Sequence, residues 1–436
     1  MVALIKALQV ILALSILIII HEFGHFTFAK LFGIRVEKFY LFFDIGGHKL
    51  LHFRIGETEY GIGWLPLGGY CKIAGMVDES MDLEQLKREP QAWEFRTHPA
   101  WQRLLVMFGG VLYNFIFAII AYCCILGIWG EAYIPNQGSG IYVNDLAYEM
   151  GFRNGDRILK LDEYEPEDFV ELQVARVRKD VRKVTLLRDG DTLDLYVDQA
   201  MIPQVLNSPF MFDLAIPFVI DSVTALNAGS GLMKGDRIVA FDGRPVEFLQ
   251  DSRPILAEYA GRTVKASVLR EGVGMRVDSL GIDLQVDSVG RIGVYMRNPD
   301  VKRKTYTFLS SIPAGFRMAG SMIAGYVQDL KLLATPSSGA YKSVGSFIAI
   351  GQVFPAVWDW YRFVYIMALL SIMLGVMNLL PIPGLDGGHI LFTLYEMVTG
   401  RKPSERFLAA AQMVGLVLLL TLMLLAFGND IGRLIK

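Results

Sequence analysis

Two histidines and a glutamate near the start of the chain are the residues best suited to chemistry. His21, Glu22 and His25 follow the apolar residues 16–20 and form the motif H-E-x-x-H. Residues four apart on an α-helix lie on one face, about one turn apart, so both imidazoles can bind one Zn²⁺. Glu22 is not needed as a ligand and can act as general base toward an attacking water. The spacing therefore predicts zinc-assisted hydrolysis.

A third zinc ligand is expected from the other end of the chain, because catalytic zinc sites use three protein ligands and one open position. Residues 381–389 contain two prolines and three glycines, which break a helix and place one carboxylate, Asp386, at membrane depth. Ionisable residues there are costly and usually functional. Asp386 is therefore the predicted ligand. His389 is the alternative ligand, and an N-cap role for Asp386 is the structural alternative.

Composition indicates a membrane protein with a sizeable aqueous part. Of the 436 residues, 53% are hydrophobic and 20% are charged, which is too apolar for an ordinary soluble protein. The net charge of −2 and the absence of a basic tail argue against nucleic acid as a partner. The lipid bilayer is instead the expected environment.

Four apolar stretches are long enough to be transmembrane helices. They cover residues 1–32, 103–129, 358–380 and 407–427. The segment from Lys30 to Arg103 carries ten lysines and arginines, against Lys6 alone at the other end of the first helix. This asymmetry favours a cytosolic loop over 33–102. Both termini are then on the outer side, and the H-E-x-x-H motif lies near the cytosolic face.

Within that loop, residues 59–70 are apolar, rich in glycine and too short to cross a membrane. We expect a β-hairpin over about 57–73 that dips into the membrane and lines the active site. Irregular backbone at that depth requires protein or a wet cavity around it. A cytosolic β-turn is the alternative.

An internal repeat follows the second span. Residues 151–158 (GFRNGDRI) recur as residues 231–238 (GLMKGDRI), at an offset of 80 residues. The repeat predicts two tandem α+β domains over 138–213 and 214–297. Residues 305–353 are weakly apolar and interrupted, and we expect them to form amphipathic helices at the outer membrane surface.

Together these features resemble the site-2 protease family of intramembrane zinc metalloproteases. The resemblance covers the whole chain and includes H-E-x-G-H, the run N-x-x-P-x-P-x-L-D-G from Asn378 to Gly387, four spans and tandem domains of the bacterial PDZ type. It implies single-span membrane proteins as substrates, such as anti-sigma factors or remnant signal peptides, after a first outer-side cut. It also implies that His21, His25 and Asp386 bind Zn²⁺ and that Glu22 acts as the catalytic base.

The resemblance also implies how substrate is held. Residues 59–70 would form a membrane-inserted sheet whose edge pairs with substrate. The residues expected to contact substrate are Asn378, Gly61, Ile62, Gly63, Trp64, Pro381 and Pro383. The implied location is the bacterial plasma (inner) membrane, with the PDZ-like domains on the outer side. Their grooves are expected to take peptides by strand addition, and spacer domains without a ligand are the alternative.

Two positions depart from the pattern of this family. A Gly-Pro-x-x-Asn-Phe motif is common in the second span, and this chain has Val111 in place of the proline but retains Asn114. Residues 42–44 are Phe-Phe-Asp where Gly-Phe-Gly is usual. These differences concern substrate gating and preference, not the chemistry.

The expected fold is a multi-pass α-helical membrane protein with four transmembrane helices, two inserted α+β PDZ-like domains and a membrane-inserted β-hairpin. Two other functional classes remain open. A metal-ion transporter would place its ligands along a path through several spans, whereas here they cluster near one face. A non-catalytic PDZ-bearing membrane scaffold would have no use for Glu22. Metal-dependent cleavage of a membrane peptide separates the three classes.

Overall fold

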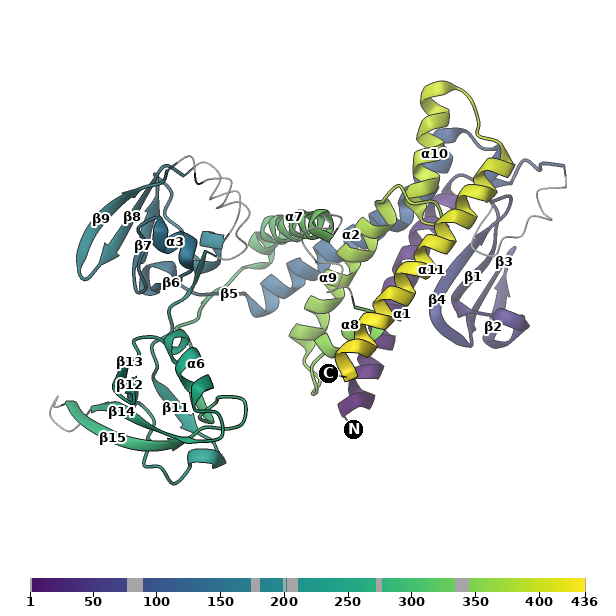
Figure 1. The fold of residues 1–436 in the computed structure, drawn as a ribbon. Coiled ribbons are helices and arrows are strands. Elements are labelled where there is room, and N and C mark those ends of the chain that lie inside the picture. Colours follow the sequence, from purple (N-terminus) through teal and green to yellow (C-terminus); the bar gives the residue numbers. More distant parts are fainter. Residues whose placement is uncertain are drawn as a thin grey trace. The chain divides into compact units, whose positions relative to one another are not determined.

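The computed structural model describes residues 2–76, 89–173, 181–198, 201, 211–271, 277–333 and 345–435. The chain divides into two compact units (Figure 1). The first consists of Met1–Gly130 and Thr305–Lys436, and the second is Glu131–Lys304. Each unit is described by itself.

The first unit is built around long apolar helices. Among the residues that the structure describes, four helices are long and apolar enough to cross a membrane. These are α1 (Val2–Leu31), α2 (Ala100–Trp129), α9 (Trp360–Leu379) and α11 (Glu405–Ile435). The other helices are α7 (Phe308–Leu333), α8 (Phe347–Val353) and α10 (Asp386–Thr399). α2 is central to this unit, because it packs against α1, α7, α9 and α10.

Helix α11 continues to Ile435, whereas the predicted span ends at residue 427. In the structure Asp430 is buried and accepts hydrogen bonds from the backbone N–H and hydroxyl of Ser346, just before α8. A carboxylate with such donors can continue an apolar helix.

Helices α1 and α2 approach closely because glycines face each other at their crossing. A methyl group on Gly24 would lie 2.2 Å from the carbonyl oxygen of Gly109, so no side chain fits there. Small residues allow helix backbones to approach closely inside membranes. The crossing brings the side chains of α1 that follow the apolar run directly against α2.

A four-stranded sheet follows α1 in the chain. Its strands are β1 (Val36–Phe43), β2 (Lys49–Ile55), β3 (Thr58–Gly63) and β4 (Leu65–Ile73), in the order β2-β3-β1-β4 (Figure 1). β1 is parallel to β3 and antiparallel to β4. The sheet therefore has β2 and β4 as its two edges.

The predicted hairpin over 57–73 is wrong. β3 and β4 are consecutive in sequence, but β1 lies between them, and the antiparallel hairpin is formed by β2 and β3. Its turn is at Gly56, which has a φ of 59°. The apolar and glycine-rich pattern correctly indicated extended chain. It could not show that β1, which precedes this stretch in sequence, lies between β3 and β4.

Phe42 adopts a backbone conformation that side chains rarely take. Its φ is 67°, in the left-handed region that glycine favours. This is the position at which the resembled family commonly has glycine. The neighbouring Asp44 accepts hydrogen bonds from Lys38 and Tyr70, which belong to β1 and β4. These bonds tie the end of β1 to the rest of the sheet.

The second unit contains two hydrophobic cores, one for each sequence repeat. The first core has members from Ile141 to Phe212, and the second has members from Phe218 to Ile292. The first repeat contains β6 (Ile141–Val143), α3 (Asp145–Glu149), β7 (Arg157–Leu161), β8 (Lys183–Arg188), β9 (Asp191–Tyr196) and β10 (Phe212–Leu214). The second contains β11 (Ile220–Val223), β12 (Arg237–Phe241), β13 (Arg244–Pro245), α6 (Leu249–Glu258), β14 (Thr263–Glu271), β15 (Val277–Gln285) and β16 (Val294–Met296). Where the unit begins and ends, β5 (Glu131–Tyr133) pairs with β17 (Lys302–Lys304).

The repeated Gly-Asp-Arg-Ile turn has the same structural role in both repeats. Asp156 and Asp236 are each 1% exposed. Asp156 accepts two hydrogen bonds from the guanidinium of Arg188, and Asp236 accepts two from Arg270. Such two-point pairs are strong and have a defined geometry. The aspartate of each turn therefore attaches the turn to the sheet behind it.

We expect Asp236→Asn to destabilise the second repeat by about 1–3 kcal/mol at neutral pH, because Arg270 loses its charged partner. Burial acts to raise the pKa of Asp236, but hydrogen bonds from Arg270 and the Met233 backbone outweigh it and hold the pKa below its usual value. The stabilisation is fully present above the unfolded-state pKa of about 3.9 and is lost as the pH falls through the lower folded-state pKa.

Hydrogen-exchange protection of β12 and β14 in the full chain measures this effect. The wild type should be better protected than Asp236→Asn at pH 7, and the two should converge in acid. Asp283→Asn, at an exposed position of β15, is the matched control and should behave as the wild type. Equal protection of the wild type and Asp236→Asn at pH 7 would show that the pair does not stabilise the repeat.

Candidate active site

The two motif histidines and Asp386 lie together in the structure. Within the described parts of the chain, they are the group of His, Cys, Asp and Glu side chains placed to hold a metal ion. His21 Nε2 is 3.3 Å from His25 Nε2 and 3.2 Å from Asp386 Oδ2, and His25 Nε2 is 3.4 Å from the same oxygen. α1 supplies the histidines, and Asp386 is the first residue of α10. His389, one turn further along α10, is not part of this group.

The geometry of this triangle fits zinc. Metal–ligand distances of about 2.0–2.1 Å in a tetrahedral site give ligand–ligand edges of about 3.3 Å, which agrees with the three distances between these ligand atoms. Asp386 Oδ2 is buried and accepts no hydrogen bond from any described residue, as expected for an oxygen that serves as a metal ligand. Two imidazole nitrogens and one carboxylate oxygen form a donor set typical of catalytic zinc, with one position left for water or substrate.

Helix α2 supports both histidines through residues spaced four apart. His25 Nδ1–H donates to the carbonyl oxygen of Val106 at 2.8 Å, which leaves Nε2 facing the cluster. A methyl group on Gly110 would lie 2.5 Å from His25 Nε2 and 2.7 Å from His21 Cε1, so only glycine fits. The side-chain amide of Asn114 lies 3.0 Å from His21 Nδ1. Val106, Gly110 and Asn114 thus form one continuous support along α2.

The sequence alone predicts no role for this support. Its glycine and asparagine are recognisable there only as members of the second-span motif. The available signal was their spacing of four residues, which places Gly110 and Asn114 on one face of a helix. The contact between this face and the H-E-x-x-H helix depends on tertiary packing, which the spacing does not predict.

Glu22 lies between the cluster and the sheet. Its carboxylate interacts electrostatically with all three clustered side chains and accepts a hydrogen bond from the backbone of Cys71 on β4. β4 is an edge strand, with β1 on one side and no described strand on the other. The site therefore combines a candidate metal cluster, a carboxylate and an edge strand.

The residues expected to contact substrate are placed differently from one another. The Asn378 amide is 3.3 Å from His21 Nε2, at the cluster itself. Residues 61–63 belong to β3, which pairs with β2 and β1 inside the sheet, whereas residues 65–70 of the same stretch belong to the edge strand β4. Contact of residues 61–63 with substrate stays a prediction.

The other three residues expected to contact substrate lie between β3 and β4 and in the turn before α10. Trp64 is 46% exposed, and its indole N–H donates to the carbonyl of Ile45. Pro381 and Pro383 belong to the turn between α9 and α10, which leads directly to Asp386. Contact of these three residues with substrate stays a prediction.

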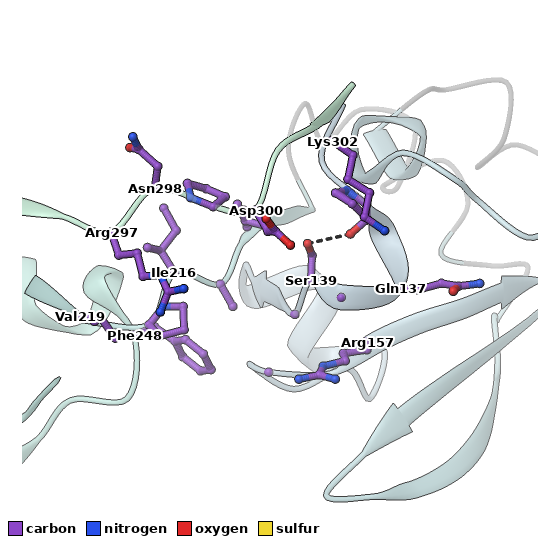
Figure 2. A pocket seen from close by; sticks show the side chains of 18 of the residues that line it. Gln137, Ser139, Arg157, Ile216, Val219, Phe248, Arg297, Asn298, Asp300 and Lys302 are labelled. Carbon is purple, nitrogen blue, oxygen red and sulfur yellow. Dashed lines mark hydrogen bonds between the residues drawn. The ribbon is translucent and has the colours of Figure 1, made fainter. Parts of the chain in front are cut away.

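A separate cavity of about 1120 Å³ lies within the second unit (Figure 2). It is lined by residues of both repeats, including Arg157 and Arg237, the equivalent arginines of the two Gly-Asp-Arg-Ile turns. Figure 2 shows Arg157 and Arg297 on opposite sides of it. The described residues of its lining include four carboxylates but no histidine or cysteine.

Comparison with known proteins defines the class to which this site belongs. The family model described as Peptidase family M50 matches residues 9–422. The chain belongs to this family, the site-2 proteases, and is a zinc metalloprotease with an intramembrane mode of action. The predicted family, enzyme class and Zn²⁺ cofactor are thereby confirmed, and the four apolar helices agree with a membrane location.

Relatives of known name are similar over their full length. The regulator of sigma-E protease RseP of Escherichia coli K12 is 31% identical over 462 residues, covering 97% of this chain and 98% of the relative. The protein of the same name from Salmonella typhimurium is 30% identical over 468 residues, with the same coverage. A relative from Vibrio cholerae, 29% identical over 455 residues and covering 97% of this chain and 98% of its own, has a name that describes a zinc metalloprotease.

Proposed function

We propose that this chain cleaves the transmembrane segment of single-span membrane proteins, with His21, His25 and Asp386 as zinc ligands and Glu22 as general base. The observation that carries the proposal is the triangle of ligand atoms, with edges of 3.2–3.4 Å, beside Glu22. When bound, Zn²⁺ lowers the pKa of a water and polarises a carbonyl. Glu22 takes the proton of the attacking water and returns it to the leaving amine.

The position of β4 at the edge of the described sheet supports a proposal for how substrate is held. A peptide bond in a membrane helix is shielded by its own hydrogen bonds and by lipid, so the substrate must be unwound before water can attack it. The unwound backbone then needs new hydrogen-bond partners, which an edge strand offers by strand addition. The hydrogen bond between Cys71 and Glu22 joins this edge to the proposed base.

We expect a substrate cysteine next to the scissile bond to form a disulfide with Cys71, but not with a cysteine introduced by Ile62→Cys. Both positions are on the same face of the sheet, since their partners Phe39 and Leu41 are two residues apart on β1. A strand added to β4 lies about 5 Å from it and about 14 Å from β3. Only the shorter spacing permits a disulfide.

The cross-linking experiment uses Glu22→Gln so that substrate is retained. Cys123 and Cys124 are replaced by alanine in both proteins, and Cys71→Ala is added to the Ile62→Cys protein. Oxidised enzyme–substrate adducts are counted on non-reducing gels. Equal adduct at both positions, or adduct at residue 62 alone, would contradict strand addition at β4.

We propose that the second unit forms two PDZ-like domains on the outer side of the bacterial plasma membrane, where they admit only substrates already cut there. The unit is inserted between α2 and α7, two helices of the first unit. The excess of lysine and arginine between residues 30 and 103 supports the orientation. The cavity shared by both repeats has the size to take an extended peptide.

Removal of residues 138–297, with a flexible linker of matching reach, should allow cleavage of an untrimmed substrate that the intact enzyme refuses. The reason is steric, because a bulky outer domain must otherwise displace the inserted unit. Cleavage of trimmed and untrimmed substrates is compared for both enzymes. A folded, zinc-loaded deletion variant that still rejects the untrimmed substrate would show that the selection occurs elsewhere.

A further inference from the structure

We propose that Asn114 is a positioning residue for the metal site: its amide oxygen accepts the hydrogen of His21 Nδ1 and so directs Nε2 toward the cluster. Asn114 is fully buried, and its side-chain amide lies 3.0 Å from His21 Nδ1. The inference rests on the proposed ligand role of His21. It gives α2 a function in metal binding, although α2 contributes none of the proposed ligands.

The hydrogen-bond inventory of His21 leads to this role. His21 Nε2 is the atom that faces His25, Asp386 and the side-chain amide of Asn378. A neutral imidazole that offers its Nε2 lone pair to a metal carries its hydrogen on Nδ1, and this buried N–H requires an acceptor. His25 meets the same need through the carbonyl of Val106. Asn114, two turns further along α2, is the group in the corresponding position for His21.

The unsatisfied atom of Asn114 indicates which end of its amide performs this role. In the structure Asn114 Nδ2 faces His21, and Oδ1 is buried without a hydrogen-bond partner among the described residues. With the hydrogen on His21 Nδ1, this orientation sets two donors against each other. A half-turn of the amide exchanges two atoms of similar size and supplies the acceptor. His21 Nδ1–H and Asn114 Oδ1 are then hydrogen-bonded to each other, and Nδ2 takes the buried place that Oδ1 had.

The backbone of Asn114 is held independently of its side chain. Its carbonyl oxygen accepts a hydrogen bond of 2.8 Å from the hydroxyl of Ser371 on α9. Both residues are fully buried. This bond provides a matched control, because Ser371→Ala loosens the same α2–α9 contact without removing the acceptor for His21.

The test measures the zinc affinity of the purified full-length chain by competition with a chelator. Asn114→Leu should weaken zinc binding about 10–100-fold, the usual effect of losing a contact that orients a ligand. Asn114→Asp should stay within a few-fold of the wild type, because a carboxylate oxygen can accept from Nδ1–H. Ser371→Ala should bind zinc as the wild type does. If Asn114→Leu does not fold, Asn114→Ala takes its place.

Two results would overturn the inference. One is wild-type zinc affinity in Asn114→Leu, and the other is an equal loss of zinc in Asn114→Asp and Asn114→Leu. Asp386→Asn is measured in the same assay. If Asp386→Asn loses zinc while Asn114→Leu does not, the inference fails and the proposed ligand set stands. If Asp386→Asn also retains zinc, the proposed ligand set itself fails.

Discussion

Replacement of Glu22 by glutamine is expected to reduce cleavage by about 10²–10⁴-fold while zinc stays bound. Glutamine cannot take the proton of the attacking water, so the base is lost. The three ligand atoms belong to other residues and remain in place. The glutamine side-chain oxygen can still accept the hydrogen bond from Cys71, so the local fold is retained.

Zinc content and cleavage are measured on the same preparation of the Glu22→Gln protein. The expected result is one zinc per chain with cleavage near background. Loss of zinc from this variant would assign Glu22 a structural role at the metal site and would remove the argument for a general base.

Asp386→Asn is expected to lose zinc and activity together. The amide keeps the shape of the carboxylate but is a poor zinc ligand, so the loss of affinity should exceed the about 10–100-fold effect of outer contacts. His389→Asn is the matched control, three residues further along α10, and should retain most of its zinc. The reverse ranking of the two variants would identify His389 as the third ligand.

The candidate metal ligands could be predicted from the sequence for two reasons. One is the spacing of neighbouring residues, and the other is the energetic cost of a charged group in a membrane. On a helix, the four-residue spacing of His21 and His25 places both side chains on the same face. Asp386 is separated from them by most of the chain, but a carboxylate at membrane depth has few roles other than a functional one. Two short stretches were therefore sufficient to predict the triangle observed in the structure.

The sheet and the support of the metal site could not be predicted in this way, because both depend on contacts between distant segments. The position of β1 between β3 and β4 decides that Cys71, and not Gly61, lies on an edge strand of the described sheet. The close crossing at Gly24 and Gly109 decides that Asn114 faces His21. Neither fact is contained in the composition or periodicity of the segments.

The sequence repeat also predicted one part of the structure and not another. The offset of 80 residues predicted two equivalent units. It did not show that the aspartate of each turn pairs with an arginine 32 or 34 residues later, on a neighbouring strand. The partners Arg188 and Arg270 lie outside the repeated motif, so only the folded sheet identifies them.

The most direct test of the central claim uses the purified chain in proteoliposomes with a single-span substrate already cut on its outer side. Cleavage products are mapped by mass spectrometry before chelation, after removal of zinc, and after zinc is added back. The predicted result is a cut inside the membrane span that stops without zinc and resumes with it. Three results would contradict the account: no cut at all, a cut that continues in zinc-free protein, or a cut that maps only outside the span.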